Sequence, residues 1–358
     1  VDSSTMPARL CLIGICALGT VVEGFVNMQV PIRPCVAGPR SSRSVGAGGL
    51  RASGLVEGDS VTIIGASSPV GRLLAAQLLT EGRFKVRLIS NDPATPDLFK
   101  AFPDAEVYVG NLAQAIDAQD TLSLLAANDA ATGIHRYGIA RPIIAAHEVL
   151  RDSSAVVLAE GTSCFPSMQW IYGLSPSVLD GRGIRNVLQS MEGGKTKRLV
   201  YLSCMGAERE LSPRFSIPKL DANILFWVLN FFGALDAKRA GETLIRDAQS
   251  RLSLETCIVR PKLHCYDSGP FGGLPQDAYD DMQYQAINLV PGDVVDGESS
   301  HPATAGVLMQ ALTHPLAANK EMCIVNSKGS APSSAMAWDQ VFGALQERER
   351  QMTPSPLR

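Results

Sequence analysis

The sequence predicts an α/β protein with a doubly wound parallel sheet. The short apolar run 61–64 is followed by a turn containing glycines and then by a helical stretch. Further short apolar runs alternate with helical stretches along the chain, which is typical of parallel strands joined by helices. With 46% hydrophobic and 19% charged residues among 358, the chain has the composition of a globular protein that can bury a core.

The expected strands and helices follow one another from residue 61 to residue 346. The expected strands are 61–64, 85–89, 106–109, 154–159, 198–203, 256–261 and 322–325. The expected helices are 71–79, 97–102, 113–127, 179–191, 236–249, 301–313 and 335–346. Residues 128–150 break this periodicity at two glycines and a proline, so we expect an inserted loop and helix there. A segment rich in Gly, Pro and Asp follows residue 261, and such segments often cover a substrate cleft.

The turn after the first strand indicates a phosphate-binding function. In residues 65–72 (GASSPVGR), glycines stand between a strand and a helix, where backbone N–H groups and the helix dipole favour a phosphate. Ser68 replaces the middle glycine of the usual pattern, and an ordinary strand-to-helix connection is the alternative. We expect the Ser68 hydroxyl to contact a phosphate. The residues predicted to bind a dinucleotide here are Gly65, Ser67, Ser68, Val70, Gly71 and Arg72.

A few residues near the ends of the first strands indicate whether NAD or NADP binds. Asp92 lies about 20 residues after the last glycine, which suits the ribose hydroxyls of NAD. Arg72 directly follows that glycine, which suits the 2′-phosphate of NADP. The sequence leaves NAD and NADP open and favours NADP slightly. Asn91 and Asn111 are further cofactor-binding candidates, although Asn111 suits a simple Asx turn equally well.

Charge and cysteine usage narrow the remaining function classes. The net charge of −3 gives no reason to expect a nucleic-acid partner. The eight cysteines and five histidines are scattered without a CxxC or a Cys/His cluster. We therefore expect neither a structural metal site nor a disulfide framework.

Residues 1–54 have the composition of a targeting presequence. The apolar run 10–22 lies where the hydrophobic region of a signal peptide lies, and it is too short to span a bilayer comfortably. Residues 26–54 contain no acid and four arginines, as transit peptides do. Together they resemble the bipartite presequence of algae with secondary plastids; a single anchor helix with a linker is the alternative. The resemblance implies a plastid protein, in the stroma or associated with thylakoids.

The rest of the chain is expected to form one domain. We predict a single NAD(P)-binding domain over residues 55–346, whose part 262–346 lies on the substrate side. Residues 347–358 are expected to be a disordered tail.

Longer motifs resemble the atypical short-chain dehydrogenase/reductases, and more narrowly their NAD(P)H-binding, NmrA-like branch of plastids and cyanobacteria. Residues 65–72 are similar to the family's GATGxxGR, and residues 161–170 (GTSCFPSMQW) to its GTTAFPSxRW. The motifs at 198–207, 232–248 and 301–315 extend the resemblance, which covers roughly residues 61–327. It implies a Rossmann-like fold with bound NADP or NAD, and it adds Gly161 to the cofactor-binding residues.

The resemblance also implies catalytic residues, and here the chain departs from the pattern. Classical relatives use Ser to polarise a carbonyl and a Tyr, with its pKa lowered by Lys, to pass a proton. Ser203 and Lys238 match the Ser and the Lys, and Lys238 would also contact the cofactor, but Ala234 stands in place of the Tyr. By residue type, the candidates for the missing proton donor are Tyr172, Tyr201 and Tyr266, and we expect Tyr201 to be buried.

The missing Tyr leaves two functions open. One is a plastid NAD(P)-dependent oxidoreductase acting on an unidentified small-molecule substrate. The other is a non-catalytic NAD(P)H-binding assembly or redox-sensing factor for photosynthetic complexes, with thylakoid or other plastid proteins as partners. A nucleotide-free structural homologue is a third interpretation, motivated by Ser68 and Asn91.

Overall fold

The computed structural model describes one compact unit of the chain, within Arg51–Glu210 and Leu229–Arg358. The described residues are 54–90, 98, 100–110, 112, 121–125, 143–161, 166, 170, 174–208, 230, 232–262, 285–293, 297 and 299–352. The expected presequence up to residue 53 and the candidates Asn91, Asn111, Tyr172 and Tyr266 lie outside them. The described residues therefore include the first expected strand and, with gaps, the chain that follows it.

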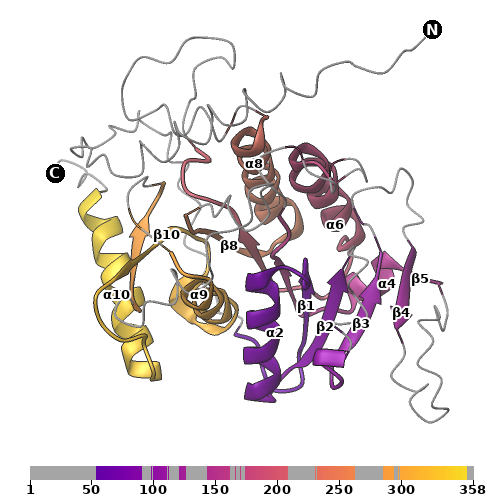
Figure 1. Cartoon of the computed structure of the whole chain (residues 1–358), viewed down its shortest axis with the longest axis horizontal. Helices are drawn as coiled ribbons and strands as arrows, with labels where there is room; N and C mark the ends of the chain where they lie inside the picture. Colours follow the sequence, from indigo (N-terminus) through magenta and orange to yellow (C-terminus); the bar gives the residue numbers. More distant parts are fainter. Residues whose placement is uncertain are drawn as a thin grey trace, which may run out of the picture. The chain divides into compact units, whose positions relative to one another are not determined.

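The described residues confirm the predicted doubly wound α/β fold. They form one ten-stranded sheet in the order β5-β4-β3-β2-β1-β6-β7-β8-β10-β9 (Figure 1). The strands are β1 (Ser60–Ile64), β2 (Lys85–Ser90), β3 (Glu106–Val109), β4 (Thr121–Leu125), β5 (Ile143–Ala145), β6 (Ala155–Leu158), β7 (Arg198–Leu202), β8 (Glu255–Arg260), β9 (Ala286–Pro291) and β10 (Lys320–Ser327). All pairings from β3 across to β10 are parallel. The order reverses between β1 and β6, which makes the carboxyl ends of these strands the topological switch point.

Helices cover both faces of the sheet. They are α2 (Pro69–Glu81), α4 (Ala146–Arg151), the π-helix η2 (Ser177–Gly183), α6 (Ile184–Ser190), α8 (Ala234–Leu252), α9 (His301–Thr313), the 3-10 turn η4 (Pro315–Ala317) and α10 (Ala335–Met352). One core cluster joins α2, α9 and α10 to the sheet, and the other joins α4, α6 and α8 to it. Successive residues of β1 take part in opposite clusters, Ile63 in the first and Ile64 in the second, because side chains alternate along a strand.

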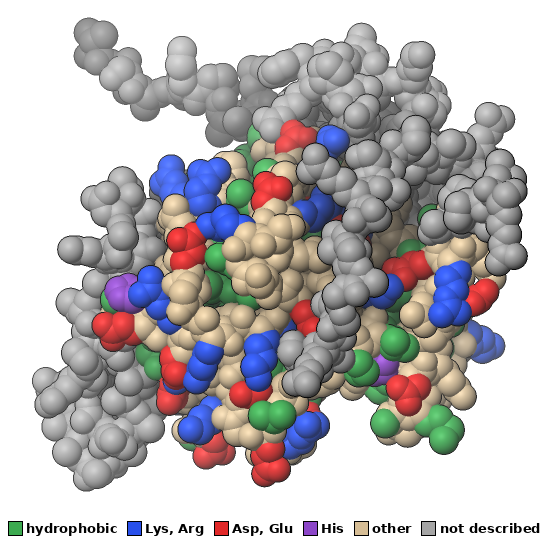
Figure 2. Space-filling model, turned by 180° about the vertical axis from the view of Figure 1, so that it is seen from behind, with side chains coloured by type: hydrophobic (Ala, Val, Ile, Leu, Met, Phe, Trp, Pro, Cys, Tyr) green, Lys and Arg blue, Asp and Glu red, His purple; other side chains and the backbone are tan. Residues whose placement is uncertain are grey.

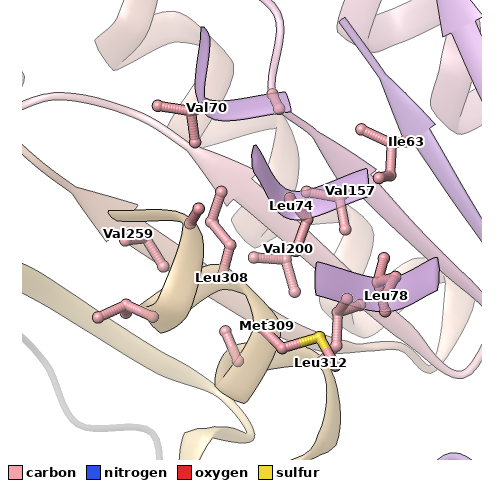
Figure 3. Packing of buried hydrophobic residues seen from close by; sticks show 14 of the residues in the cluster. Ile63, Val70, Leu74, Leu78, Val157, Val200, Val259, Leu308, Met309 and Leu312 are labelled. Atoms are coloured by element: carbon pink, nitrogen blue, oxygen red, sulfur yellow. The ribbon is translucent and has the colours of Figure 1, made fainter. Parts of the chain in front are cut away.

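The first core cluster holds the two predicted helices α2 and α9 against the same face of the sheet. Leu74 and Leu78 of α2 pack toward Leu308 and Leu312 of α9, with strand valines such as Val200 beneath them (Figure 3). All of these leucines have no exposed surface. At about 25 cal/mol per Å² of apolar surface, each contributes roughly 1.5–3 kcal/mol to folding. Helix α2, and the turn that precedes it, is thereby held firmly on the sheet.

A buried ion pair holds the carboxyl end of α9. Arg198 on β7 donates to Glu255 on β8 at 2.5 Å, and both side chains are almost fully buried. The same guanidinium donates to the carbonyl oxygens of Ala311, Leu312 and His314, which end α9. Arg198 therefore supplies a donor to carbonyls that a helix leaves without intrahelical partners.

Three strands differ from the sequence-based expectation. Residues 113–127 were expected to be helical, but Thr121–Leu125 form β4, which pairs antiparallel with β3. Ile143–Ala145 form β5 inside the expected inserted loop and helix, and β9 pairs antiparallel with β10. These additions lie at the two ends of the sheet, where unpaired backbone groups of β3 and β10 accept a further strand. The predicted parallel sheet is thus extended by antiparallel strands at its edges.

The last helix is longer than expected. Helix α10 runs to Met352, so the first part of the expected disordered tail is helical. Its end is held on the sheet because Arg348 donates to the Leu289 carbonyl at 2.6 Å and Glu349 pairs with Lys320. The expected helix 179–191 consists of two helix types. Its first part belongs to the π-helix η2, and its second part is the α-helix α6.

The surface of the described part carries both signs of charge. On the face shown in Figure 2, positive and negative side chains lie interspersed. Among the described residues some opposite charges pair, such as Arg87 with Asp152 at 2.7 Å. In the part of the chain that the structure describes, no helix has the length and apolar character needed to cross a membrane.

Candidate functional site

The glycines after β1 are required by close backbone approaches. Gly65 has a φ of +81°, and a Cβ there would lie 2.5 Å from the backbone N and Cα of Glu160. A Cβ at Gly71 would lie 2.4 Å from the Gly65 carbonyl oxygen. Such distances exclude any side chain, so the turn packs tightly on itself and on the segment that follows β6. The turn after β1 therefore lies directly at the switch point.

Ser68 has a structural role that the sequence did not reveal. It is the N-cap of α2: its Oγ accepts from the Gly71 N–H at 3.0 Å, and Pro69 follows at the first helical position. The same hydroxyl donates to the Ala159 carbonyl at 3.1 Å, which joins the turn to the end of β6. Its proton and one of its acceptor positions are therefore used within the protein, whereas the sequence analysis expected the hydroxyl to contact a phosphate.

The start of α2 is suited to binding an anion. The helix has 13 residues and no acid in its first turn, so its dipole presents a positive end without a competing carboxylate. Val70 is the second helical residue, where a backbone N–H has no partner within the helix, and among the described residues the Ser67 N–H has no backbone acceptor. Arg72 stays beside them because its Nε donates to the Ser67 carbonyl at 3.2 Å. These groups fit a pyrophosphate.

Lys238 lies on the other side of the switch point. Its Nζ donates to the Glu160 carbonyl at 3.3 Å, to Asp180 Oδ1 at 2.8 Å and to the Leu202 carbonyl at 3.1 Å. It also lies 5.1 Å from the ring centroid of Tyr201, whose hydroxyl donates to Asp180 at 2.9 Å. An ammonium has three protons, and all three have acceptors here. Lys238 thus connects the carboxyl ends of β6 and β7 with η2.

Asp180 belongs to this site, although no motif of the sequence marked it. It is 4% exposed and belongs to η2, a π-helix, a geometry that often occurs at functional sites. The sequence contains one signal for this site: two glycines, at 181 and 183, follow Asp180 inside an expected helix. A small cavity beside it, about 10 Å³ and large enough for one water, is also lined by Ile64, Glu160 and Tyr201.

Tyr201 is unsuited to the role of proton donor. It is 1% exposed, as expected. Burial, and the charge of the Asp180 carboxylate that accepts its proton, raise the pKa of Tyr201 well above its ordinary value. Ala234 is also buried at the start of α8. The described residues therefore place no tyrosine hydroxyl where the family pattern has one.

Ser203 is directed into a buried network of charges. Its Oγ donates to Glu242 Oε1 at 2.7 Å, and Glu242 has no exposed surface. Arg260 donates to both carboxylate oxygens of Glu242, at 2.7 and 2.9 Å. Ser203 and Lys238, predicted to act together, thus donate to different carboxylates.

The network around Glu242 continues to β10. Glu321 on β10 accepts from Arg260 at 2.7 Å and from Arg246 at 2.6 and 2.7 Å. Burial opposes the ionisation of Glu321, but the hydrogen bonds and charges of Arg246 and Arg260 outweigh it and lower its pKa to about 2. Across the described residues, no group of three His, Cys, Asp or Glu side chains is arranged to hold a metal ion.

Gly161 borders open space. It directly follows Glu160 at the end of β6, and a Cβ at Gly161 would have no atom within 4 Å. The predicted cofactor-binding residues Gly65, Ser67, Ser68, Val70, Gly71 and Arg72 lie together in the turn. Gly65 contacts Glu160, and Glu160 in turn accepts from Lys238, so these residues, Gly161 and Lys238 all lie around the switch point.

Comparison with known proteins identifies one family. Residues 65–315 match a family model described as NAD(P)H-binding. No curated protein sequence is similar enough to count as a relative. The matched range contains the glycine turn, Asp180, Ser203 and Lys238.

Several solved structures resemble the chain. A proposed NAD-dependent epimerase/dehydratase from Bacillus halodurans is 17% identical, with a TM-score of 0.49 over 82% of this chain and 100% of that one. An oxidoreductase from Lactococcus lactis is 13% identical, with a TM-score of 0.49 over 83% and 100%. A short-chain dehydrogenase/reductase from Veillonella parvula, in complex with NADP, is 13% identical, with a TM-score of 0.47 over 77% and 99%.

Proposed function

Because the chain belongs to the NAD(P)H-binding family, we propose that it is an NAD(P)H-dependent oxidoreductase of the atypical short-chain dehydrogenase/reductase class that lacks the usual catalytic tyrosine. The observation that carries this proposal is the start of α2. Two sterically required glycines, a capped helix without an acid in its first turn and Arg72 together make an anion site at the switch point.

The residues of the site divide between the two halves of the cofactor. The N–H groups of Ser67 and Val70 would hold the pyrophosphate, and Arg72 would face a 2′-phosphate, which favours NADP. When bound, the dinucleotide supplies the hydride. Lys238 would border the nicotinamide half, and its protons already have acceptors in the protein. A proton for the substrate therefore comes from a group other than a tyrosine at position 234.

A specific observation favours a second function. Ser203 donates to Glu242 and Lys238 donates to Asp180, so neither side chain is directed toward a shared substrate atom. This arrangement suits a protein that binds NAD(P)H without turning it over, such as an assembly or redox-sensing factor for photosynthetic complexes. Thylakoid or other plastid proteins would then be its partners.

Titration of the purified full chain with NADPH and NADH, followed by cofactor fluorescence, tests the shared premise. We expect saturable binding of NADPH, with weaker binding of NADH. Absence of binding to both would refute both functions. Where NADPH binds, its consumption with a panel of plastid metabolites supports the oxidoreductase, whereas retention of NADPH throughout and recovery of the protein with thylakoid complexes support the binding factor.

We also propose that the protein acts in a plastid reached through residues 1–54. The support is the apolar run 10–22 followed by the acid-free, arginine-containing stretch 26–54. Residues 1–54 fused to a fluorescent protein should direct it to the plastid of an alga with a secondary plastid. Deletion of residues 26–54 from the fusion should leave the protein in the secretory pathway. Cytosolic fluorescence of the complete fusion would refute the location.

A further inference from the structure

Lys238 and Asp180 form a buried pair of opposite charges. The Nζ and Oδ1 atoms are 2.8 Å apart, and the two side chains are only 9% and 5% exposed. Water screens such a pair poorly. If one of the two charges is removed, the remaining charge therefore acts strongly on a neighbouring ligand. The Tyr201 hydroxyl adds a neutral hydrogen bond to the same carboxylate.

The pair lies on the side of the switch point that the nicotinamide half of a dinucleotide would occupy. In this fold the pyrophosphate lies at the start of α2, and the adenosine ribose is bound near the end of β2. The adenosine half therefore extends over β2 and β3, and the other half extends over β6 and β7. Lys238 donates to the carbonyls of Glu160 and Leu202, at the carboxyl ends of β6 and β7.

The two redox states of the cofactor differ in charge at this end. The oxidised nicotinamide ring carries one positive charge, and the reduced ring is neutral. An uncompensated ammonium would repel the oxidised ring and leave the affinity for the reduced ring nearly unchanged. A carboxylate that neutralises the ammonium removes this difference in affinity between the oxidised and the reduced ring.

We propose that Asp180 is a specificity-determining residue that neutralises Lys238 and so lets the site bind the oxidised as well as the reduced dinucleotide. The inference rests on the proposed binding of NAD(P)H and adds a role for a residue that no motif marks. Asp180 acts through charge. Glu160, which also lines the small cavity, stays unaltered in every variant below, so its charge contributes equally to each comparison.

The test compares the dissociation constants of NADP⁺ and NADPH for the full chain, by calorimetry and fluorescence at pH 8. Asp180→Asn keeps an acceptor for Lys238 and Tyr201 but removes the negative charge. At an effective dielectric constant of about 20, one charge about 12 Å from the ring changes affinity by roughly tenfold, and a nearer charge changes it by more. We therefore expect the ratio of the NADP⁺ to the NADPH dissociation constant to rise about tenfold. Lys238→Met leaves the carboxylate alone and should lower the ratio by a similar factor.

Two further variants separate charge from structure. The double variant Asp180→Asn with Lys238→Met removes both charges, so its ratio should return to within about threefold of the wild-type value. Tyr201→Phe removes a hydrogen bond to Asp180 without a change of charge, and it should leave the ratio unaltered even where it lowers thermal stability.

The outcomes distinguish this inference from the proposed function. Wild-type protein that binds neither NADP⁺ nor NADPH refutes the function and the inference with it. Wild-type binding combined with an unchanged ratio in Asp180→Asn and in Lys238→Met refutes only the inference. A double variant that keeps the shifted ratio of Asp180→Asn would show that structure, rather than charge, causes the shift, and it would also overturn the role of Asp180.

Discussion

Substitution of Gly71 by Ala tests whether the turn after β1 forms the cofactor site. The added methyl group would lie 2.4 Å from the Gly65 carbonyl oxygen, 2.9 Å from Ser68 Oγ and 3.0 Å from Ala66 Cα. Two of these atoms belong to the backbone, so no rotamer change relieves the contact. The turn must move away from α2, and the hydrogen bond from the Gly71 N–H to Ser68 is weakened with it.

The magnitude follows from two costs. Overpacking by one methyl group costs about 1–3 kcal/mol. For a domain of this size, each kcal/mol lowers Tm by about 2–4 °C. The displaced N–H groups of Ser67 and Val70 would no longer converge on a phosphate, and the loss of charge-assisted hydrogen bonds worth about 1.5–3 kcal/mol each weakens NADPH binding by at least roughly tenfold.

The assay combines thermal unfolding followed by circular dichroism with NADPH titration. Gly343→Ala is the matched control: Gly343 lies within α10, a Cβ there has no atom within 4 Å, and the change should stabilise by up to about 1 kcal/mol without an effect on NADPH. Gly71→Asp adds bulk and a negative charge and should abolish binding. Wild-type Tm and wild-type NADPH affinity in Gly71→Ala would refute the steric reasoning and the placement of the cofactor.

Four further changes have defined outcomes. Ser68→Ala removes the N-cap of α2 and should cost about 0.5–2 kcal/mol in urea unfolding; an unchanged midpoint would contradict the capping role. Gly161→Val meets no protein atom at its Cβ, so it should keep the wild-type Tm but weaken NADPH binding, and an unchanged affinity would place the cofactor elsewhere. The pKa of Glu321 is lowered from 4.5 to about 2, so its contribution to stability is complete above pH 4.5 and is lost as the pH falls from 4.5 toward 2. Glu321→Gln should flatten the unfolding free energy across that pH window, and an equally steep decline in the variant would assign the acid sensitivity to other groups. Arg198→Met leaves Glu255 charged and buried and should cost about 3–5 kcal/mol in urea unfolding, whereas a loss below 1 kcal/mol would show that the pair contributes little.

The central elements of the fold were predictable because they depend on local patterns. The runs that became β1, β2, β3, β7 and β8 are short and apolar, and α9 was expected over the residues it occupies. The glycine turn was recognisable because its two glycines stand a few residues apart between a strand and a helix, although the close approach that requires Gly65 is to the distant Glu160. Local sequence also predicts a phosphate-binding function for residues 65–72.

The edges of the sheet were not predictable in this way. Residues 121–125 fit a helical pattern as well as a strand, and the free edge of β3 decides between them. Strands β5 and β9 were likewise not predicted. β5 pairs with β4 and β9 pairs with β10, and no local sequence pattern indicates either pairing. Tertiary pairing overrides a weak local preference in each case.

The sequence by itself determined the order of strands and helices, the glycine turn and the absence of a tyrosine at position 234, because each of these is a property of neighbouring residues. Only the tertiary structure decided what the candidate side chains bind. Ser203 and Glu242 are 39 residues apart, and Lys238 and Asp180 are 58 apart. Such partners meet only when the sheet brings the ends of distant strands together, and buried polar groups then take the partners within reach.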